Sequence, residues 1–113
     1  MWDTGATNSC ISQRLAKHLG LTFIDLCDVE GVHGIEPAKV YLVDILLPNT
    51  VSINNVHVTE FFDNDDFEVI IGMDIITKGD LAMSNSGGKT IVSFRIPPGQ
   101  PPIDFNREDG RIY

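Results

Sequence analysis

The sequence predicts a mainly β protein with one amphipathic helix and a short helical turn towards its C-terminal part. Three observations lead to this class. Several short segments alternate apolar and polar residues, which is typical of half-buried strands. Turn-forming residues, chiefly glycine and asparagine, separate these segments. Residues 12–19, by contrast, place their apolar side chains at helical spacing.

The length and net charge of the chain limit its number of domains and its possible binding partners. Its 113 residues correspond to one domain. A domain of this size buries roughly two thirds of its unfolded surface, which is enough for a core. Sixteen acidic residues against eight basic ones give a net charge of −8. This balance argues against nucleic acid or an anionic membrane as a partner. With no apolar segment of membrane-span length and no signal-peptide pattern, we expect a soluble, cytoplasmic protein.

The sequence predicts neither a metal nor another cofactor. Residues that commonly bind metals are scattered, without ligand spacing: Cys10, Cys27, His18, His33 and His57. The acidic segment 63–66 lacks the glycine and the terminal glutamate of a calcium loop, so we interpret it as a solvated loop. Without a secretion signal, we expect the two cysteines to be free thiols.

The clearest helix is predicted for residues 12–19. Ser12 is a suitable N-cap, and Gly20 is a suitable glycine just beyond the last turn. Leu15, Ala16 and Leu19 form the apolar stripe. We interpret this segment as a structural amphipathic helix.

A long hairpin is predicted to follow. Residues 21–29 favour a strand, and residues 39–47 give the strongest strand signal of the chain. Both faces of the second strand are largely apolar, which predicts that it is covered on both sides. Residues 25–47 therefore form a hairpin whose tip is the glycine-rich stretch Gly31-Val32-His33-Gly34.

The next segment is predicted to contain two breaks between strands. Pro48-Asn49-Thr50 predicts a turn. Apolar alternation changes phase at Asn54-Asn55, which predicts a β-bulge or a tight turn there. Residues 67–71 then predict a short apolar strand.

The C-terminal part is predicted to contain a helical turn, a second hairpin and a tail. Residues 73–79 favour one or two helical turns that end at Gly79. Residues 81–84 and 90–96 predict the two hairpin strands. Four prolines within residues 97–102 exclude a sheet interior, so we expect an extended tail over residues 97–113.

Chemistry is concentrated at Asp3-Thr4-Gly5-Ala6-Thr7, almost the first residues of the chain. A glycine at this spacing lets the backbone approach the carboxylate closely. The threonine supplies a hydroxyl and an N–H that can hold the loop. The sequence therefore predicts a tight loop that presents the Asp3 carboxylate. Either another part of the fold supports this loop or a preceding strand is missing.

Three pieces in this order resemble the retropepsin-like aspartic proteases, in particular bacterial single-domain members. They are Asp3-Thr4-Gly5-Ala6-Thr7, the hairpin with the Gly31–Gly34 tip, and Val69-Ile70-Ile71-Gly72-Met73-Asp74. The resemblance covers residues 2–96. It implies a closed, mainly antiparallel retropepsin-type barrel and a homodimer that hydrolyses a peptide or protein substrate. Each chain contributes one aspartate, and the sequence contains no second Asp-Thr-Gly or Asp-Ser-Gly.

The resemblance also implies residue roles. Asp3 is the catalytic acid and base, and Thr4, Gly5, Ala6 and Gly72 support the loop and the paired aspartates. Thr4 braces the two loops across the dimer axis, Gly5 offers its backbone to the substrate, and Gly72 packs behind Thr4. Gly31, Val32, His33 and Gly34 form the tip of the flap, where we interpret His33 as solvent-facing. Ile70 and Ile75, with Val32, hint at a hydrophobic substrate pocket. For Asp74 we favour a structural role, as a helix cap or a partner for a basic residue.

In one respect the chain departs from the family pattern. Members have a strand that leads into Asp-Thr-Gly, whereas only Met1 and Trp2 precede it here. We therefore expect an N-terminally truncated protease domain over residues 1–96, followed by the proline-rich tail over residues 97–113. The alternative function is a catalytically inactive dimerisation or peptide-binding module with the same fold.

Overall fold

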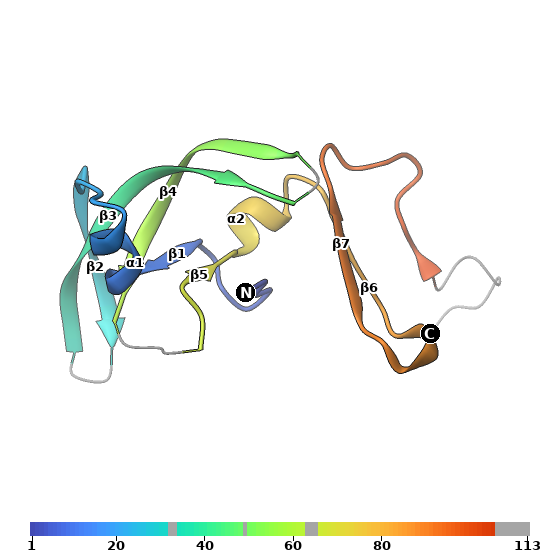
Figure 1. Cartoon of the computed structure of the whole chain (residues 1–113), viewed down its shortest axis with the longest axis horizontal. Coiled ribbons are helices and arrows are strands. Elements are labelled where there is room, and N and C mark those ends of the chain that lie inside the picture. Colours follow the sequence, from blue (N-terminus) through green and yellow to red (C-terminus); the bar gives the residue numbers. More distant parts are fainter. Residues whose placement is uncertain (32–33, 49, 63–65, 106–113) are drawn as a thin grey trace. The chain divides into compact units, whose positions relative to one another are not determined.

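A computed structural model describes residues 1–31, 34–48, 50–62 and 66–105 (Figure 1). The chain forms two compact units, Met1–Ile75 and Ile76–Tyr113. Strands make up most of the regular structure in both, and the helices are few and short, so the mainly β class is confirmed. No helix in the described ranges has the length and apolar character needed to cross a membrane.

The first unit is built on a five-stranded sheet with the order β2-β3-β4-β1-β5 (Figure 1). Its strands are β1 (Cys10–Ser12), β2 (Asp25–Gly31), β3 (Gly34–Leu46), β4 (Ser52–Phe61) and β5 (Val69–Ile70). β1 pairs with β4 in parallel, and the other three pairings are antiparallel. The sheet is therefore mixed. In the described part of the chain β2 and β5 are its two edges, so closure into a barrel stays a prediction.

The predicted long hairpin is formed by β2 and β3. Its register runs from Asp25 opposite Val40 to Gly31 opposite Gly34. Gly34 has a φ of 105°, a value that favours glycine. The first strand begins at Asp25 instead of Leu21, although the Ile24 N–H already donates to the Val40 carbonyl at 2.8 Å. Val32 and His33 at the predicted tip lie outside the described residues.

The predicted covering of β3 on both faces is wrong for most of its length. Val40 and Tyr41 are both buried, so both faces are covered at that point. Beyond it, Leu42 is 43% exposed and Leu46 is 75% exposed. Apolar residues on both faces of a strand therefore do not guarantee that both faces are covered, because apolar side chains can also remain at the surface.

The predicted irregularity at Asn54-Asn55 is a β-bulge. Val43 pairs with Val56 and Ile45 with Ile53, so β4 has one residue more than β3 between these pairs. Asn55 has a φ of 57°, which asparagine tolerates better than most residues. Its N–H donates to Asp44 Oδ1 at 2.9 Å, and this bond holds the bulge.

The predicted helix is α1 (Gln13–His18). Ser12 is its N-cap, and the Ser12 Oγ accepts a hydrogen bond from the Leu15 N–H at 3.0 Å. Gly20 follows the last turn with a φ of 67°, and its N–H donates to the Lys17 carbonyl. Of the predicted apolar stripe, Ala16 is 1% exposed and packs in the core, whereas Leu19 is 57% exposed, so the prediction is wrong for Leu19.

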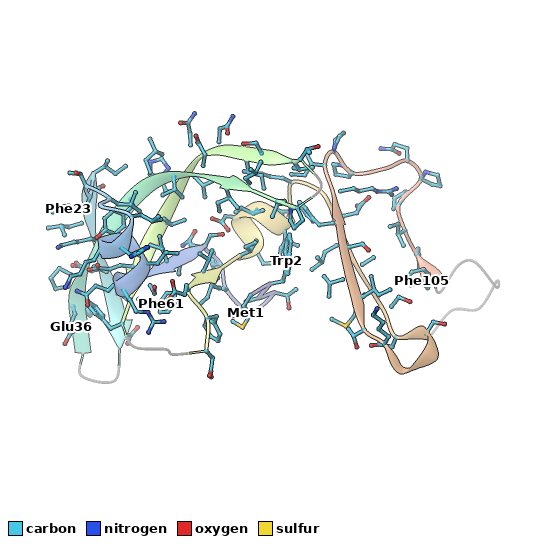
Figure 2. The ribbon with its side chains drawn as sticks, viewed as in Figure 1. Met1, Trp2, Phe23, Glu36, Phe61 and Phe105 are labelled. Carbon is cyan, nitrogen blue, oxygen red and sulfur yellow. The ribbon has the colours of Figure 1, made fainter. Side chains whose placement is uncertain are left out.

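The core of the first unit lies between the sheet and the segments that pack on it. Its buried apolar residues include Ile11, Ala38, Val40, Tyr41, Ile53, Val56, Val58, Ile71 and Ile75. Burial of each large aliphatic side chain contributes about 1.5–3 kcal/mol. At the end of β4, Phe61 (labelled in Figure 2) packs against Phe67 with ring centroids 6.2 Å apart. The Lys39 ammonium lies 5.2 Å from the centre of the Phe23 ring.

The second unit contains the predicted second hairpin. α2 (Met73–Ile76) leads into it, and the Gly79 N–H donates to the Ile76 carbonyl at 3.2 Å. β6 (Asp80–Ser84) and β7 (Ile91–Arg95) pair antiparallel through a 3₁₀ turn at Ser86–Gly88. The short helical turn and this hairpin are thus both confirmed.

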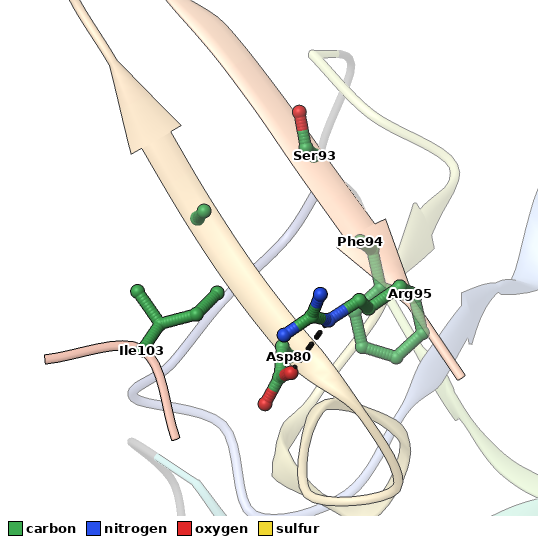
Figure 3. A pocket seen from close by; sticks show the side chains of 6 residues that line it. Asp80, Ser93, Phe94, Arg95 and Ile103 are labelled. Carbon is green, nitrogen blue, oxygen red and sulfur yellow. Dashed lines mark hydrogen bonds and ion pairs between the residues drawn. The ribbon is translucent and has the colours of Figure 1, made fainter. Parts of the chain in front are cut away.

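The segment after β7 folds back onto this hairpin. The Asp80 Oδ2 accepts hydrogen bonds from the Arg95 Nε at 2.7 Å and from the Gly99 N–H at 2.8 Å. These contacts, the Gly99 N–H first and the Arg95 guanidinium second, hold the pKa of Asp80 below its usual range. Asp80, Arg95 and Ile103 line a pocket of about 220 Å³ (Figure 3). The described part of the tail therefore packs on its own unit.

Candidate active site

The Asp3 loop is supported by a segment nearly seventy residues away in the sequence. The Asp3 N–H donates to the Ile71 carbonyl at 2.9 Å, and the Ile71 N–H donates to the Met1 carbonyl at 2.7 Å. Trp2 forms a parallel β-bridge with Ile71. The Asp3 loop is therefore supported by another part of the fold, which the sequence left open as one possibility.

Within the loop, the backbone holds one oxygen of the Asp3 carboxylate. The Gly5 N–H donates to Asp3 Oδ1 at 2.8 Å, and the Ala6 N–H donates to the Asp3 carbonyl at 3.2 Å. A Cβ at Gly5 would lie only 3.1 Å from Asp3 Oδ1. The predicted close approach of glycine to the carboxylate is therefore present. Among the described residues Asp3 Oδ2 accepts no hydrogen bond, so this oxygen is available to a ligand.

Gly72 is the point of closest approach between the loop and its supporting segment. A Cβ at this position would meet the Asn8 carbonyl carbon and oxygen at 2.8 Å and the Ala6 oxygen at 2.9 Å. Real side chains do not approach backbone this closely, so only glycine fits. Gly72 thus packs closely against the loop, but its nearest neighbours are Ala6 and Asn8 instead of the predicted Thr4.

Ser9, which was not among the predicted site residues, connects the loop to Asp74. The Ser9 N–H donates to Asp74 Oδ2 at 3.0 Å, and the Ser9 hydroxyl donates to Asp74 Oδ1 at 2.8 Å. Asp74 thus has a structural contact, as favoured from the sequence, although its partner is a serine and not a basic residue. The only sequence signal for Ser9 is its place as a small hydroxyl residue between the loop and an apolar stretch.

Comparison with known families agrees with this geometry. A sequence model described as aspartyl protease matches residues 1–75. The chain belongs to the aspartyl protease family. The retropepsin-like resemblance inferred from the three sequence motifs is thereby confirmed. The match to the aspartyl protease model ends where the first compact unit ends. None of the curated proteins compared with the chain matches it.

The other predicted site residues differ from one another in exposure and in hydrogen bonding. Thr4 is exposed, and within the described ranges its hydroxyl has no hydrogen-bond partner. The Ala6 carbonyl accepts from the Met73 N–H at 2.8 Å. Ile70 lies in β5 opposite Cys10 and is half-buried, whereas Ile75 is 1% exposed and packs in the core. Of these two isoleucines, only Ile70 offers surface to a ligand in the single chain.

Cys10 directly follows the Asp3 loop in the sequence, and the fold brings Cys27 into the same region, which the sequence did not indicate. Cys10 is the partner of Thr59 in the β1–β4 ladder, and the Cys27 Sγ lies 3.9 Å from the Thr59 Oγ1. Both cysteines are free. Burial raises the pKa of the Cys10 thiol, and electrostatic interactions with Asp74, Cys27 and Asp3 raise it further. Cys10 is therefore a weakly reactive thiol, because the thiolate is the reactive form.

Cys10 is expected to react with iodoacetamide at pH 8 more slowly than a free small thiol such as N-acetylcysteine. A raised pKa leaves a smaller thiolate fraction at a given pH, and burial also restricts access. The measurement is the rate of mass increase of a Cys27→Ser variant, which leaves Cys10 as its single thiol. Unfolding this variant in guanidinium should raise the rate to that of the small thiol. Equal rates in the folded and unfolded protein would contradict the assignment.

Proposed function

We propose that the chain is an aspartic endopeptidase that hydrolyses peptide bonds as a homodimer. The observation that carries this proposal is the Asp3 loop, in which the Gly5 N–H holds Asp3 Oδ1 and leaves Oδ2 available. Membership of the aspartyl protease family supports the reaction class. The single Asp-Thr-Gly in the sequence supports the homodimer, because the chemistry needs two carboxylates.

In the proposed mechanism, Asp3 of each of two copies contributes one carboxyl group to a dyad. Two carboxylates about 3 Å apart cannot both ionise, so the pair shares one proton. The ionised group takes a proton from a water molecule, whose oxygen then attacks the carbonyl carbon of the peptide bond. The protonated group gives its proton to the carbonyl oxygen, so a tetrahedral intermediate forms. The carbon–nitrogen bond then breaks as the group that took the water proton gives it to the departing amine nitrogen, and the other group takes back a hydroxyl proton as the carbonyl re-forms. The two groups titrate as a unit. Because each copy supplies only one of them, neither copy alone has the catalytic pair.

Other residues have supporting roles in this proposal. The exposed Thr4 hydroxyl braces the loop of one copy against the loop of the other. Gly5 presents its backbone to the substrate, and the β2–β3 hairpin acts as a flap through its tip at Gly31, Val32, His33 and Gly34. Ile70 contributes to a hydrophobic pocket. A closed retropepsin-type barrel further requires that the β2 and β5 edges be joined or covered. The free thiols support a reducing compartment such as the cytoplasm.

Activity is expected to depend on protein concentration. When the protein is diluted below the dissociation constant of the dimer, cleavage of a peptide library per mole of chain should fall in proportion to concentration, because only dimers contain the pair. Sedimentation over the same range should show dimers converting to monomers.

A constant activity per mole in a strictly monomeric sample would overturn the dimer mechanism. If the chain forms dimers and binds peptides but cleaves none, the non-catalytic peptide-binding module is the correct function instead.

A further inference from the structure

We infer that Ser9 and Asp74 form a side-chain clamp that positions Asp3, and that both are positioning residues for the reaction. Neither residue is predicted to touch the substrate, and nothing in the sequence motif marks Ser9 for such a role. The inference rests on the proposed peptidase function, because positioning matters only if Asp3 reacts.

The clamp is fully connected by hydrogen bonds. Ser9 is 0% exposed, and its hydroxyl donates to Asp74 Oδ1 at 2.8 Å while accepting from the Gly72 N–H at 3.0 Å. The Ser9 N–H donates to Asp74 Oδ2 at 3.0 Å, and the Ile75 N–H donates to Asp74 Oδ1 at 3.0 Å. The Asp74 carboxylate therefore accepts three hydrogen bonds, and hydrogen bonds to an ionised acceptor are roughly twice as strong as neutral ones.

The clamp lies at one end of the catalytic loop, and Asp3 lies at the other. Residues 71–75 contact both ends: the Ile71 carbonyl holds the Asp3 N–H, while Gly72 and Asp74 hold Ser9. Between them, the Met73 N–H donates to the Ala6 carbonyl and the Asp74 N–H donates to the Thr7 carbonyl at 3.1 Å. The loop is thus fixed along its length to one segment.

The backbone hydrogen bonds of the loop and the side-chain contacts of the clamp respond differently to substitution. The backbone hydrogen bonds at Asp3, Ala6 and Thr7 survive a change in the Ser9 or Asp74 side chain. Removal of the clamp should therefore shift the loop without detaching it. A displacement of a reacting group by about 1 Å can reduce the rate about 100-fold, even when the changed residue is remote from the chemistry.

The test is a set of four variants assayed on one peptide substrate. For Ser9→Ala and Asp74→Ala, we expect kcat to fall about 10- to 100-fold with KM changed by less than about twofold. Asp74→Asn keeps the size and one acceptor oxygen, so it should recover part of kcat. Ser52→Ala is the matched control for Ser9→Ala, because Ser52 is exposed in β4 and, among the described residues, its hydroxyl donates one local hydrogen bond, to Asn54 Oδ1 at 2.7 Å. This control should retain the parent kcat.

Hydrogen exchange provides a readout that does not depend on activity. In Ser9→Ala, the amides of Gly72 and Gly5 should exchange faster, while amides in the β2–β3 hairpin should keep the parent rates. If Ser9→Ala does not fold, Asp74→Asn is measured in the same way. An unchanged kcat, or a raised KM with kcat intact, in a folded variant would overturn the clamp.

The same measurements separate the two proposals. If the parent chain itself cleaves no peptide, the peptidase proposal fails, and the exchange rates alone decide the clamp. Faster exchange at Gly5 in the variants then supports positioning of the Asp3 loop by Ser9 and Asp74. Parent-like exchange at Gly5 overturns it.

Discussion

Asp3→Asn is expected to abolish peptide cleavage while leaving the fold intact. An amide cannot take a proton from water, and loss of a general acid–base group typically lowers the rate about 10²- to 10⁴-fold. Asparagine retains an oxygen that can accept the Gly5 N–H, which now donates to Asp3 Oδ1 at 2.8 Å. The thermal unfolding midpoint should therefore stay close to that of the parent. The measurements are cleavage of a fluorogenic peptide library and a melting curve of the same sample.

Asp44→Asn is the matched control for this substitution. Asp44 Oδ1 likewise accepts a backbone hydrogen bond, from the Asn55 N–H at 2.9 Å, but this bond lies at the β-bulge between β3 and β4. This variant should retain full activity. Mixing parent and Asp3→Asn chains in equal amounts should leave about one quarter of the dimers with two intact aspartates. An Asp3→Asn variant that cleaves as well as the parent would show that the catalytic assignment is wrong.

Gly72→Ala is expected to destabilise the first unit strongly. Its Cβ would lie 2.8 Å from the carbonyl carbon and oxygen of Asn8, and neither atom belongs to a flexible side chain. Forcing a methyl group into such a contact typically costs about 1–3 kcal/mol of unfolding free energy. Because the contact lies between the Asp3 loop and residues 71–75, this loop should be displaced as well. Denaturant unfolding followed by circular dichroism measures the cost.

Gly20→Ala is the control that separates the steric clash at Gly72 from ordinary backbone strain. Gly20 has a φ of 67°, but a Cβ there would meet nothing within 4 Å. Its substitution should cost about 1 kcal/mol, from the left-handed conformation alone. A Gly72→Ala variant that is no less stable than Gly20→Ala would mean that the loop and residues 71–75 are not in close contact.

Sequence patterns predicted the elements that depend on local signals. Ser12 and Gly20 marked the ends of α1, and each makes the hydrogen bond expected of its type. The change of apolar phase at Asn54-Asn55 marked the bulge in β4. In the candidate site, the Asp3-Thr4-Gly5 spacing predicted the close approach of Gly5 to the carboxylate. These features involve residues within a few positions of one another, so they are readable from one stretch of sequence.

The features that could not be predicted depend on residues far apart in the chain. The parallel pairing of β1 with β4 joins Cys10 to Thr59, and no pattern within either strand specifies it. The contact between Ser9 and Asp74 could not be predicted for the same reason. The two residues are far apart in the sequence, and only the fold brings their side chains together. The exposure of Leu42 and Leu46 was missed because apolar residues look the same in sequence whether a partner element covers them or not.

The attachment of the Asp3 loop to residues 69–75 has a consequence for how the chain matures. Residues 1–9 are synthesised before residues 69–75, and the hydrogen bonds that join these two segments link residues more than sixty positions apart. Such long-range closure is slow compared with the formation of local structure. The helix and the β2–β3 hairpin can therefore form while the Asp3 loop is still without support. Chains whose synthesis has not yet reached residues 69–75 therefore carry Asp3 in an unsupported loop.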